Sequence, residues 1–376
     1  MIYFDNAATT YPKPEIVYKE LDNANRNAFN TGRGSYKVAR EQSTIIDNVR
    51  EKLLKISKMD NSDVIFTSSA TQALNSILLN LDFKEGDNIY ISPFEHNSVI
   101  RVLEVLKKKY NIKIIHIPFD KETWNIDEKK LENLFVLNNP KLIILSHVSN
   151  TTGLILPYNL IFKIGKKYNS INILDSSQAL GILNIEGTEN IDFIVFAGHK
   201  SLYASFGIAG FIKKKLVSLK KFIYGGNGSD TMNPNMPELG YGAYEAGSPN
   251  IVGIRALNIS MDWITEKSIY EEEKKITNYL ISELAKLNNI KLFIPKDFKN
   301  KIFGIVSIGV QGYSSDEVGK ILDDEFGICV RTGFHCAPLV HDFIDSMEYN
   351  GTVRISLSYF TTKKEIDELI KALKSL

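Results

Sequence analysis

Short apolar runs alternate with stretches of helical periodicity through the first part of the chain. The apolar runs lie at 64–66, 88–91, 113–117, 142–145, 171–174, 193–196 and 208–212, and helices are predicted from about residue 38 and at 71–81, 97–109, 127–137 and 159–168. Strands that are apolar throughout and separated by helices are typical of a mostly parallel sheet covered on both faces. The pattern predicts an α/β fold whose ligands lie beyond the carboxyl ends of the strands.

The alternation of apolar runs and helical stretches ends at about residue 224. The stretch 224–250 is rich in Gly, Asn and Pro and is predicted to be a long functional loop. A helical stretch is predicted at 251–287, followed by strands at 302–310, 328–331 and 353–357 and helices at 314–326 and from Thr362. This part is predicted to form a smaller α+β domain.

The composition indicates what kind of protein this is, but it does not indicate which reaction the protein catalyses. The 376 residues are 44% hydrophobic and carry a formal net charge of +1, which fits two globular domains and gives no sign of a nucleic-acid or membrane partner. No apolar run approaches the roughly 20 residues that cross a bilayer, and the first residues do not resemble a secretion signal. Two cysteines are too few to brace the fold, so a reducing, cytoplasmic setting is expected.

Two predicted strands end in residues that suit pyridoxal phosphate (PLP). Asp175 follows the strand at 171–174, with Gln178 three residues later, and Lys200 follows the strand at 193–196. A PLP enzyme needs a lysine that binds the cofactor aldehyde as a Schiff base, and an acid that keeps the pyridine nitrogen protonated. Lys200 alone would be interpreted as an ordinary surface charge; the acid at the neighbouring strand end favours the cofactor.

Other predicted strands also end in polar residues. The Ser-Ser-Ala-Thr stretch at 68–71 separates a strand from a helix, where hydroxyls and free backbone N–H groups bind a phosphate, although such residues also cap helices without further function. His96 lies at a similar junction, where an imidazole can stack on a cofactor ring, and Asn150 follows the strand at 142–145. Each residue has a structural explanation alone, and together they indicate one site.

The stretch Cys-Val-Arg-Thr-Gly-Phe-His-Cys-Ala-Pro at 329–338 contains both cysteines. Cys329 lies in an apolar run and is expected to be a buried packing residue. Cys336 is expected in a loop, as a catalytic or an incidental thiol. A zinc site formed with His335 and His341 is disfavoured, because the remaining histidines lack ligand spacing. Arg354 begins a predicted strand, where its planar fork suits either a substrate carboxylate or a surface salt bridge.

Together these segments resemble the cysteine desulfurases of the class V aminotransferase family over nearly the whole chain. The most specific pieces are the sequences at 3–10 (Tyr-Phe-Asp-Asn-Ala-Ala-Thr-Thr), 198–200 (Gly-His-Lys), 245–250 (Glu-Ala-Gly-Ser-Pro-Asn) and 331–337 (Arg-Thr-Gly-Phe-His-Cys-Ala). The last resembles the short active-site loop of the group II, SufS-like branch. The resemblance implies the type I PLP-dependent transferase fold, with a mostly parallel sheet in the large domain and a smaller α+β C-terminal domain.

The resemblance implies a cofactor role for each matching residue. Lys200 would hold PLP, Asp175 would face the pyridine nitrogen, Gln178 would bond the ring hydroxyl, and His96 would stack on the ring. The phosphate would be bound by four residues, the last of them from the second subunit of a homodimer: Ala70 through its backbone, Thr71, His199 and Ser248.

It also implies a reaction and a domain division. Asn150 and Arg354 would bind the carboxylate of L-cysteine, and Cys336 would take the sulfur as a persulfide, leaving L-alanine. His96 or His335 would assist by accepting a proton, and a protein such as an iron–sulfur scaffold, a thiolation enzyme or a small carrier would receive the sulfur. The expected divisions are an N-terminal segment that packs with the small domain (1–14), the large PLP-binding domain (15–255) and the small domain with the cysteine loop (256–376).

Several positions depart from the family pattern. Ala197 stands where serine or threonine is usual, Ala70 where threonine is common, Gln72 where glutamate is common, and 203–207 replaces a turn richer in glycine and proline. These changes predict weaker phosphate binding. Alternative functions are a selenocysteine lyase, a class V aminotransferase or C–S lyase in which Cys336 is idle, and a sulfur-relay scaffold. Lys200 and Asp175 argue against the scaffold, and Cys336 argues against the aminotransferase.

Overall fold

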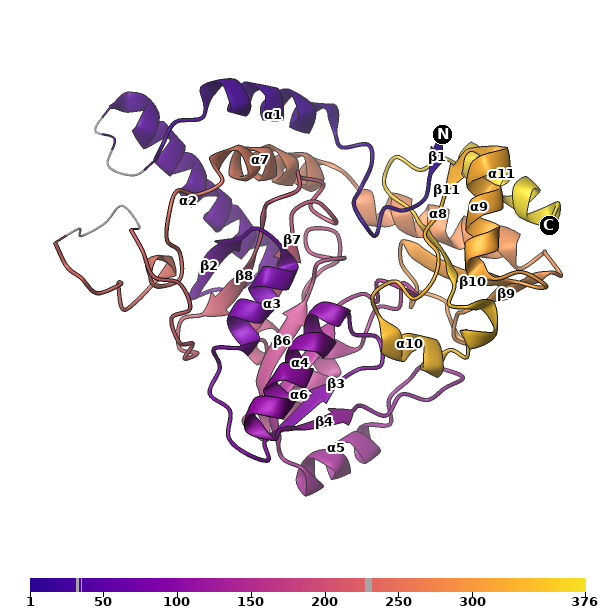
Figure 1. The fold of residues 1–376 in the computed structure, drawn as a ribbon, viewed down its shortest axis with the longest axis horizontal. Helices are drawn as coiled ribbons and strands as arrows, with labels where there is room; N and C mark the ends of the chain where they lie inside the picture. The colour runs from indigo at the N-terminus through magenta and orange to yellow at the C-terminus, as the bar shows by residue number, and fades with distance from the viewer. Residues whose placement is uncertain (32–33, 35, 227–231) are drawn as a thin grey trace.

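The computed structural model describes residues 1–31, 34, 36–226 and 232–376 (Figure 1). Its largest sheet has seven strands in the order β2-β8-β7-β6-β5-β3-β4. These strands are β2 (Ser62–Thr67), β3 (Asn88–Ile91), β4 (Lys113–His116), β5 (Pro140–Ser146), β6 (Ile171–Asp175), β7 (Phe193–Ala197) and β8 (Ala209–Lys214). The neighbours from β7 to β4 pair in parallel, whereas β8 runs antiparallel to both β7 and β2. The predicted α/β fold with a mostly parallel sheet is confirmed.

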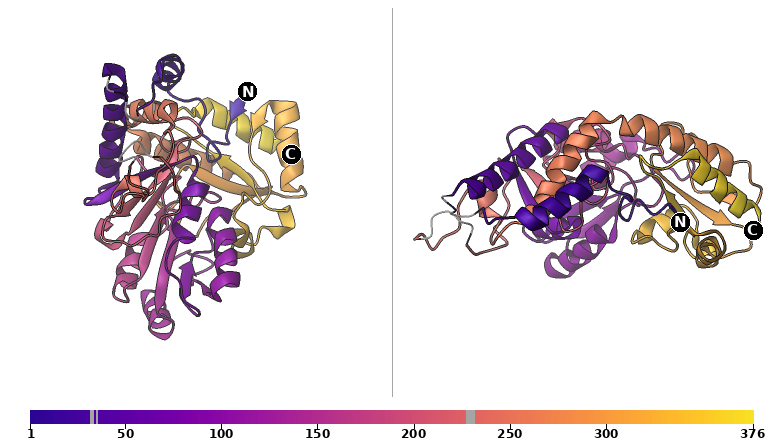
Figure 2. Two further views of the ribbon diagram at one scale, coloured as in Figure 1. Left: turned by 60° about the vertical axis from the view of Figure 1, so that its left-hand side comes forward. Right: turned by 90° about the horizontal axis from the view of Figure 1, so that it is seen from above.

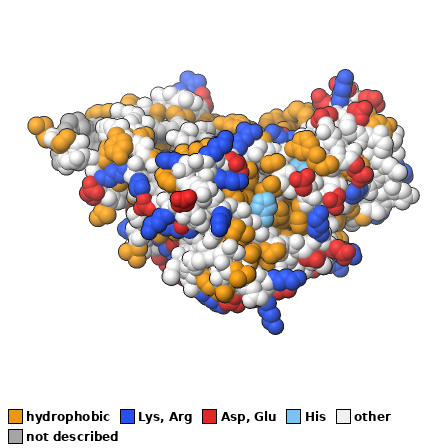
Figure 3. Space-filling view, turned by 60° about the horizontal axis from the view of Figure 1, so that its bottom comes forward, with side chains coloured by type: hydrophobic (Ala, Val, Ile, Leu, Met, Phe, Trp, Pro, Cys, Tyr) orange, Lys and Arg blue, Asp and Glu red, His pale blue; other side chains and the backbone are white. Residues whose placement is uncertain are grey.

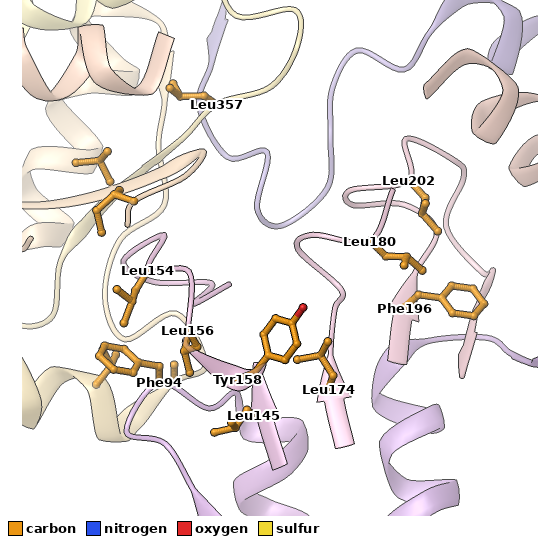
Figure 4. Packing of buried hydrophobic residues seen from close by; sticks show 14 of the residues in the cluster. Phe94, Leu145, Leu154, Leu156, Tyr158, Leu174, Leu180, Phe196, Leu202 and Leu357 are labelled. Atoms are coloured by element: carbon orange, nitrogen blue, oxygen red, sulfur yellow. The ribbon is translucent and has the colours of Figure 1, made fainter. Parts of the chain in front are cut away.

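Adjacent residues of the central strands point to opposite faces of this sheet, and both faces are buried. Leu145 and Leu174 belong to the core on one face (Figure 4), and Ile144 and Ile173 belong to the core on the other. The first core includes residues of α2 (Lys37–Ser57), α5 (Glu128–Leu137), α6 (Tyr158–Lys166) and α7 (Ile251–Glu266). The second includes residues of α3 (Ala70–Leu78) and α4 (Asn97–Tyr110). Because helices cover both faces, these strands are apolar throughout instead of alternating.

The C-terminal part contains a smaller antiparallel sheet in the order β12-β10-β9. Its elements are α8 (Ile269–Leu284), β9 (Ile290–Leu292), β10 (Ile305–Val310), α9 (Ser315–Phe326), β11 (Ile328–Cys329), α10 (Pro338–Phe343), β12 (Val353–Ser356) and α11 (Lys363–Lys374). Ser314 and Glu317 form a capping box at the start of α9, and Gly327, with a φ of 63°, ends the helix.

The helix predicted at 251–287 is interrupted, because Lys267 is extended and separates α7 from α8. The expected domain limit between residues 255 and 256 falls inside α7; the domain limits stay a prediction. The predicted loop at 224–250 contains a short 3-10 turn at Tyr241–Ala243, and its residues 227–231 lie outside the described part of the chain.

The N-terminal segment reaches the C-terminal part. β1 (Ile2–Tyr3) pairs in parallel with β11, so that Ile2 lies opposite Ile328. Both chain ends lie beside the C-terminal sheet (Figures 1 and 2). The chain then forms α1 (Glu15–Asn27), which packs against α7 and which the hydrophobic pattern did not predict. Cys329, on β11, was expected to be buried and is only half-buried, because this two-stranded pair lies near the surface.

The surface carries both signs of charge. On the face shown in Figure 3, lysine and arginine side chains are interspersed with aspartate and glutamate, and hydrophobic side chains lie between them. None of the helices in the described ranges combines the length and apolar character needed to span a bilayer.

Candidate active site

A small cavity of about 50 Å³ lies at the carboxyl ends of the parallel strands. β5 ends at Ser146 and β6 at Asp175, and these two residues are paired in the sheet. The helices α3 and α4 begin beside the cavity, and β7 leads toward it through the turn at 198–200. The predicted site residues that line it are Ala70, Thr71, His96, Asn150, Asp175, Gln178 and Lys200.

Lys200 and Asp175 face the same cavity from neighbouring strands. Burial lowers the pKa of the Lys200 amine, while Asp175 and, more weakly, Cys336 raise it. Oδ1 of Asp175 accepts hydrogen bonds from the backbone N–H and the hydroxyl of Ser177, at 3.0 and 2.6 Å. Gln178 donates to the Ala7 carbonyl at 2.9 Å. A lowered lysine pKa favours the neutral amine, which is the form that reacts with an aldehyde.

His96 is the N-cap of α4 and lines the cavity. Its Nδ1 accepts a hydrogen bond from the backbone N–H of Ser98 at 3.0 Å. Because Nδ1 is the acceptor, the neutral ring carries its proton on Nε2. Burial and the neighbouring Lys200 lower the pKa of His96 to about 4. The ring is therefore neutral at physiological pH and presents a donor at Nε2.

The N-terminus of α3 forms a second feature of the cavity. Ser69 caps the helix by accepting from the Gln72 N–H at 3.1 Å, and among the described residues the backbone N–H groups of Ala70 and Thr71 meet no acceptor. A free helix N-terminus attracts an anion through these N–H groups and the helix dipole. Ala70 and Thr71 are thus positioned as the phosphate prediction requires.

His199 lies next to Lys200 but does not line the cavity. Its ring stacks on Phe206 at 4.5 Å between centroids, and its Nδ1 is buried with no hydrogen-bond partner among the described residues. Burial, Lys200 and Lys13 lower the pKa of His199 to about 3. Lys13 donates to the His199 carbonyl at 2.7 Å, and burial lowers the pKa of this lysine to about 7.

Arg354 lies at the centre of a buried ion pair rather than at the surface. Its side chain is 3% exposed, and its guanidinium pairs with Asp5 at 2.5 Å, from the N-terminal segment. Nη1 donates to the Asn150 carbonyl at 2.9 Å, and Nε is buried with no partner among the described residues. Arg331 lies 3.6 Å from the other Asp5 oxygen. The surface salt bridge considered from the sequence is wrong, because the ion pair is buried. Two of the five guanidinium N–H donors are used on Asn150 and Asp5.

The loop that carries Cys336 adjoins the cavity. The backbone N–H of Asn97, next to His96, donates to the Cys336 carbonyl at 2.6 Å. The amide of Asn150 donates to the His335 carbonyl at 2.8 Å. Cys336 is exposed, whereas the His335 ring is buried and contacts Thr352 through Nε2. The structure thus attaches the backbone of the cysteine loop to Asn150 and to the residue after His96, both at the cavity.

Ser248 lies in a different cavity from the predicted cofactor residues around Lys200. It lines a larger cavity of about 420 Å³ formed by α2, the end of β2 and the segment 241–250. Arg50 and Glu245 are paired there at 2.7 Å. Within one chain, Ser248 does not join the residues around Lys200.

Sequence reasoning gave no role to Glu95, Asp5 or Lys13. The Glu95 side chain is fully buried and accepts from the N–H and the hydroxyl of Ser146, at 3.1 and 2.8 Å, and from the Ser92 hydroxyl at 2.5 Å. Burial raises the pKa of Glu95 to about 7. It fixes the loop before His96 to the end of β5. The sequence did contain a signal for this role, since Glu95 is a carboxylate directly before His96 at a strand-to-helix junction. Its partner Ser146 is 51 residues away, and nothing in the sequence indicated that contact.

Comparisons with known proteins support the geometry. A profile of the family described as aminotransferase class-V matches residues 2–369. A cysteine desulfurase of Wigglesworthia glossinidia brevipalpis is 29% identical over 99% of this chain and 92% of its own. A putative cysteine desulfurase of Plasmodium berghei, PbSufS, is 31% identical over 100% of this chain and 83% of its own. The apo structure of a cysteine desulfurase from Thermococcus onnurineus NA1 superposes with a TM-score of 0.87 at 27% identity, covering 100% of this chain and 94% of that one.

Proposed function

Because this chain belongs to the aminotransferase class-V family, we propose that it converts L-cysteine to L-alanine and takes the sulfur onto Cys336 as a persulfide. The observation that carries the proposal is the docking of the Cys336 loop on the cavity of Lys200, Asp175 and His96, through the hydrogen bonds from Asn97 and Asn150. The relatives named cysteine desulfurase agree with the enzyme class predicted from the sequence.

Enzymes of this family depend on PLP, so the predicted cofactor is confirmed, and the residues present fit it. Lys200 has a lowered pKa and Asp175 lies beside it. At the start of α3, the N–H groups of Ala70 and Thr71 are donors that meet no acceptor among the described residues. The buried Nδ1 of His199 also lacks a partner among them. When bound, PLP supplies a ring that accepts electrons from the substrate α-carbon.

The chain's own residues then have separate tasks in the proposal. Lys200 would hold the cofactor aldehyde, and its amine, whose pKa burial lowers, would move the α-proton of the substrate. Asp175 would keep the pyridine nitrogen protonated, and Gln178 would bond the ring hydroxyl. Arg354 offers its unpartnered Nε to the substrate carboxylate, next to Asn150.

His96 acts in this proposal as a hydrogen-bond donor. Its Nδ1 is occupied by the Ser98 N–H, so a thiol proton could reach the ring only after that cap is broken. Stacking on the cofactor ring is compatible with its place on the cavity wall. His335 is also a poor proton acceptor, because burial lowers its pKa well below the usual range.

In the sulfur-transfer step, the Cys336 thiolate attacks the sulfur of the substrate. A sulfur–sulfur bond forms as the bond between that sulfur and the substrate β-carbon breaks. The electron pair of the broken bond stays with the carbon skeleton, which takes up a proton and leaves as alanine. The exposed position of Cys336 then allows an acceptor protein to collect the sulfur.

A second copy of the chain would complete the site. Phe206 and Tyr241 are large hydrophobic residues that are 65% and 44% exposed, and Tyr241 lies beside Ser248 in the larger cavity. A homodimer that buries this face would bring Ser248 to the phosphate of its partner. We also propose the group II branch, as the name of the Plasmodium berghei relative suggests, delivery of sulfur for iron–sulfur assembly, and a cytoplasmic setting that keeps both free cysteines reduced.

The proposal is tested by incubating the purified protein with L-cysteine and a reductant and measuring alanine and sulfide. Equal amounts of both are expected. Pyruvate and ammonia instead of alanine would indicate a C–S lyase, and amino transfer to a keto acid would indicate an aminotransferase. Activity on selenocysteine without activity on cysteine would favour the selenocysteine lyase.

A further inference from the structure

The backbone of the Cys336 loop adopts conformations that require outside support. Gly333, His335 and Cys336 have φ angles of 85°, 47° and 55°. The left-handed region is unfavourable for residues with a Cβ, and two such residues in succession persist only where surrounding contacts hold them. The position of the thiol therefore depends on the groups that hold the loop.

The loop is held from two sides. On the side of the C-terminal sheet, Thr352 donates its N–H to the Gly333 carbonyl at 3.0 Å, and its hydroxyl lies 2.7 Å from Nε2 of His335. On the side of the large sheet, the Asn97 backbone holds the Cys336 carbonyl and the Asn150 amide holds the His335 carbonyl. Asn97 makes its bond through the backbone, whereas Asn150 makes its bond through the side chain. Of these two bonds between the described residues, a substitution can therefore remove that of Asn150.

Asn150 also belongs to the cavity. It lines the cavity together with Lys200, and its own carbonyl accepts from Nη1 of Arg354. A side-chain amide has two N–H donors. One is used on the His335 carbonyl, which leaves the other for a group that enters the cavity. One residue can therefore contact both the substrate and the loop that carries the thiol.

We propose that Asn150 is a positioning residue for Cys336, coupling the occupancy of the Lys200 cavity to the placement of the cysteine loop. This inference rests on the proposed function for the identity of the occupant. The amide fixes the thiol relative to the point where the substrate carboxylate is bound. Its loss frees the loop and slows sulfur transfer, while the cofactor stays in place.

The test compares Asn150→Asp with wild type by hydrogen–deuterium exchange of the peptide that contains residues 332–337. Aspartate has the same shape, but its carboxylate cannot donate to the His335 carbonyl. We expect exchange of the Ala337 N–H, which is bonded to Phe334, to become about tenfold faster, the size expected for losing one hydrogen bond. Single-turnover persulfide formation at saturating L-cysteine should slow by a similar factor.

Thr352→Val is the matched control, because it loosens the same loop from the side that does not touch the cavity. L-Alanine carries the amine and the carboxylate of the substrate but no sulfur. Adding it should change the hydrogen–deuterium exchange of the loop in wild type and in Thr352→Val. The exchange in Asn150→Asp and in Asn150→Ala should not change. Unchanged exchange in both Asn150 variants, or a normal response of these variants to L-alanine, would overturn the proposal.

The result is separable from the proposed function. Absence of cofactor absorbance or of sulfide release in the wild type would refute the desulfurase proposal alone. If the Asn150 variants lost PLP, the cofactor-free forms of wild type and variant would be compared, since both partners of the Asn150–His335 hydrogen bond belong to the chain itself. If the loop exchanged at the same rate in cofactor-free wild type and in the cofactor-free Asn150 variants, the proposed coupling would also be overturned.

Discussion

The cavity around Lys200 and the loop around Cys336 touch each other, but they are built in different ways. Asp175 is the last residue of β6 and is paired with Val195, and Lys200 lies in the tight turn that follows β7, so a sheet packed on both faces fixes the backbone of both. His335 and Cys336 are both left-handed, and their loop depends on bonds from Asn97, Asn150 and Thr352. Substitutions in the cavity should alter the chemistry directly. The cysteine loop should also respond to substitutions outside it, at the residues whose hydrogen bonds hold it in place.

The largest effect is expected for Lys200→Ala. The variant should lose the covalent bond to the cofactor and its yellow colour, and activity should fall by several orders of magnitude. Absorbance spectra and borohydride reduction measure this. Lys213→Ala, which removes a buried lysine of β8 outside the cavity, should retain the colour. A borohydride-reducible cofactor bond in Lys200→Ala would contradict the assignment.

Cys336→Ala should separate the two regions. The variant should bind PLP and change its spectrum with L-cysteine, because neither step uses the thiol, but the protein persulfide and sulfide release should disappear. Mass spectrometry after brief exposure of wild type to L-cysteine should find one extra sulfur on the Cys336 peptide. Cys329→Ala is the control and should cost about 1 kcal/mol of stability or less, since Cys329 is only half-buried. Normal desulfuration by Cys336→Ala would falsify the sulfur-transfer mechanism.

A smaller effect is expected on the pH dependence of stability. The folded-state pKa of Glu95 is about 7, above its ordinary value of 4.5. The folded state thus keeps a proton that the unfolded state releases, so this contribution to stability is complete below pH 4.5 and is lost as the pH rises to 7. The loss is on the order of 1–3 kcal/mol.

Glu95→Gln removes this titration and keeps a side chain that can accept from Ser146. We compare the urea midpoint of unfolding of this variant with that of wild type at each pH. At pH 8 the midpoint of the variant should be close to that of wild type or higher, and at pH 5 it should be lower. Glu273→Gln is the matched variant, because Glu273 is also buried, bonds Tyr203 at 2.7 Å and has a pKa raised to about 7. Glu273 is absent from the cavity lined by Asp175 and His96, but it lines a second small cavity with Lys200 and Gln178. Both substitutions should flatten the stability profile, and a change in the cofactor spectrum is expected for Glu95→Gln because Glu95 fixes the loop before His96. A parallel pH profile in wild type and Glu95→Gln would refute the titration.

An effect of similar size, on cofactor retention rather than on stability, is expected for Ala197→Ser, which places a hydroxyl at the end of β7. A hydrogen bond to a charged group contributes roughly 1.5–3 kcal/mol, so PLP loss on dialysis should slow by about tenfold or more. Ala209→Ser is the control, because Ala209 faces Ala197 across the β7–β8 pair and is equally buried. Equal PLP retention in wild type and Ala197→Ser would show that the missing hydroxyl is already replaced.

The difference between the two regions also explains what the sequence could predict. Asp175, Lys200 and Asn150 were found because strand and helix patterns place the carboxyl ends of parallel strands at one edge of a sheet. The pairing of Asp5 with Arg354 was not found, because the residues are 349 positions apart and neither carries a local signal of the other. The helix α1 was missed because it buries only Val17 and Ala24 fully, which leaves a weak apolar stripe. The left-handed turn at His335 and Cys336 was missed because tertiary contacts, not residue preferences, impose it.

The long separation between Asp5 and Arg354 has a consequence for biosynthesis. Asp5 leaves the ribosome 349 residues ahead of its partner, which at ~5–20 residues per second is roughly 17–70 s. During that interval the large sheet can fold with the strand ends around Lys200 already aligned, but the guanidinium that would hold a substrate does not yet exist. A nascent chain should therefore be able to bind the cofactor before it can bind an amino acid, because Lys200 and Asp175 are synthesised well before Arg354.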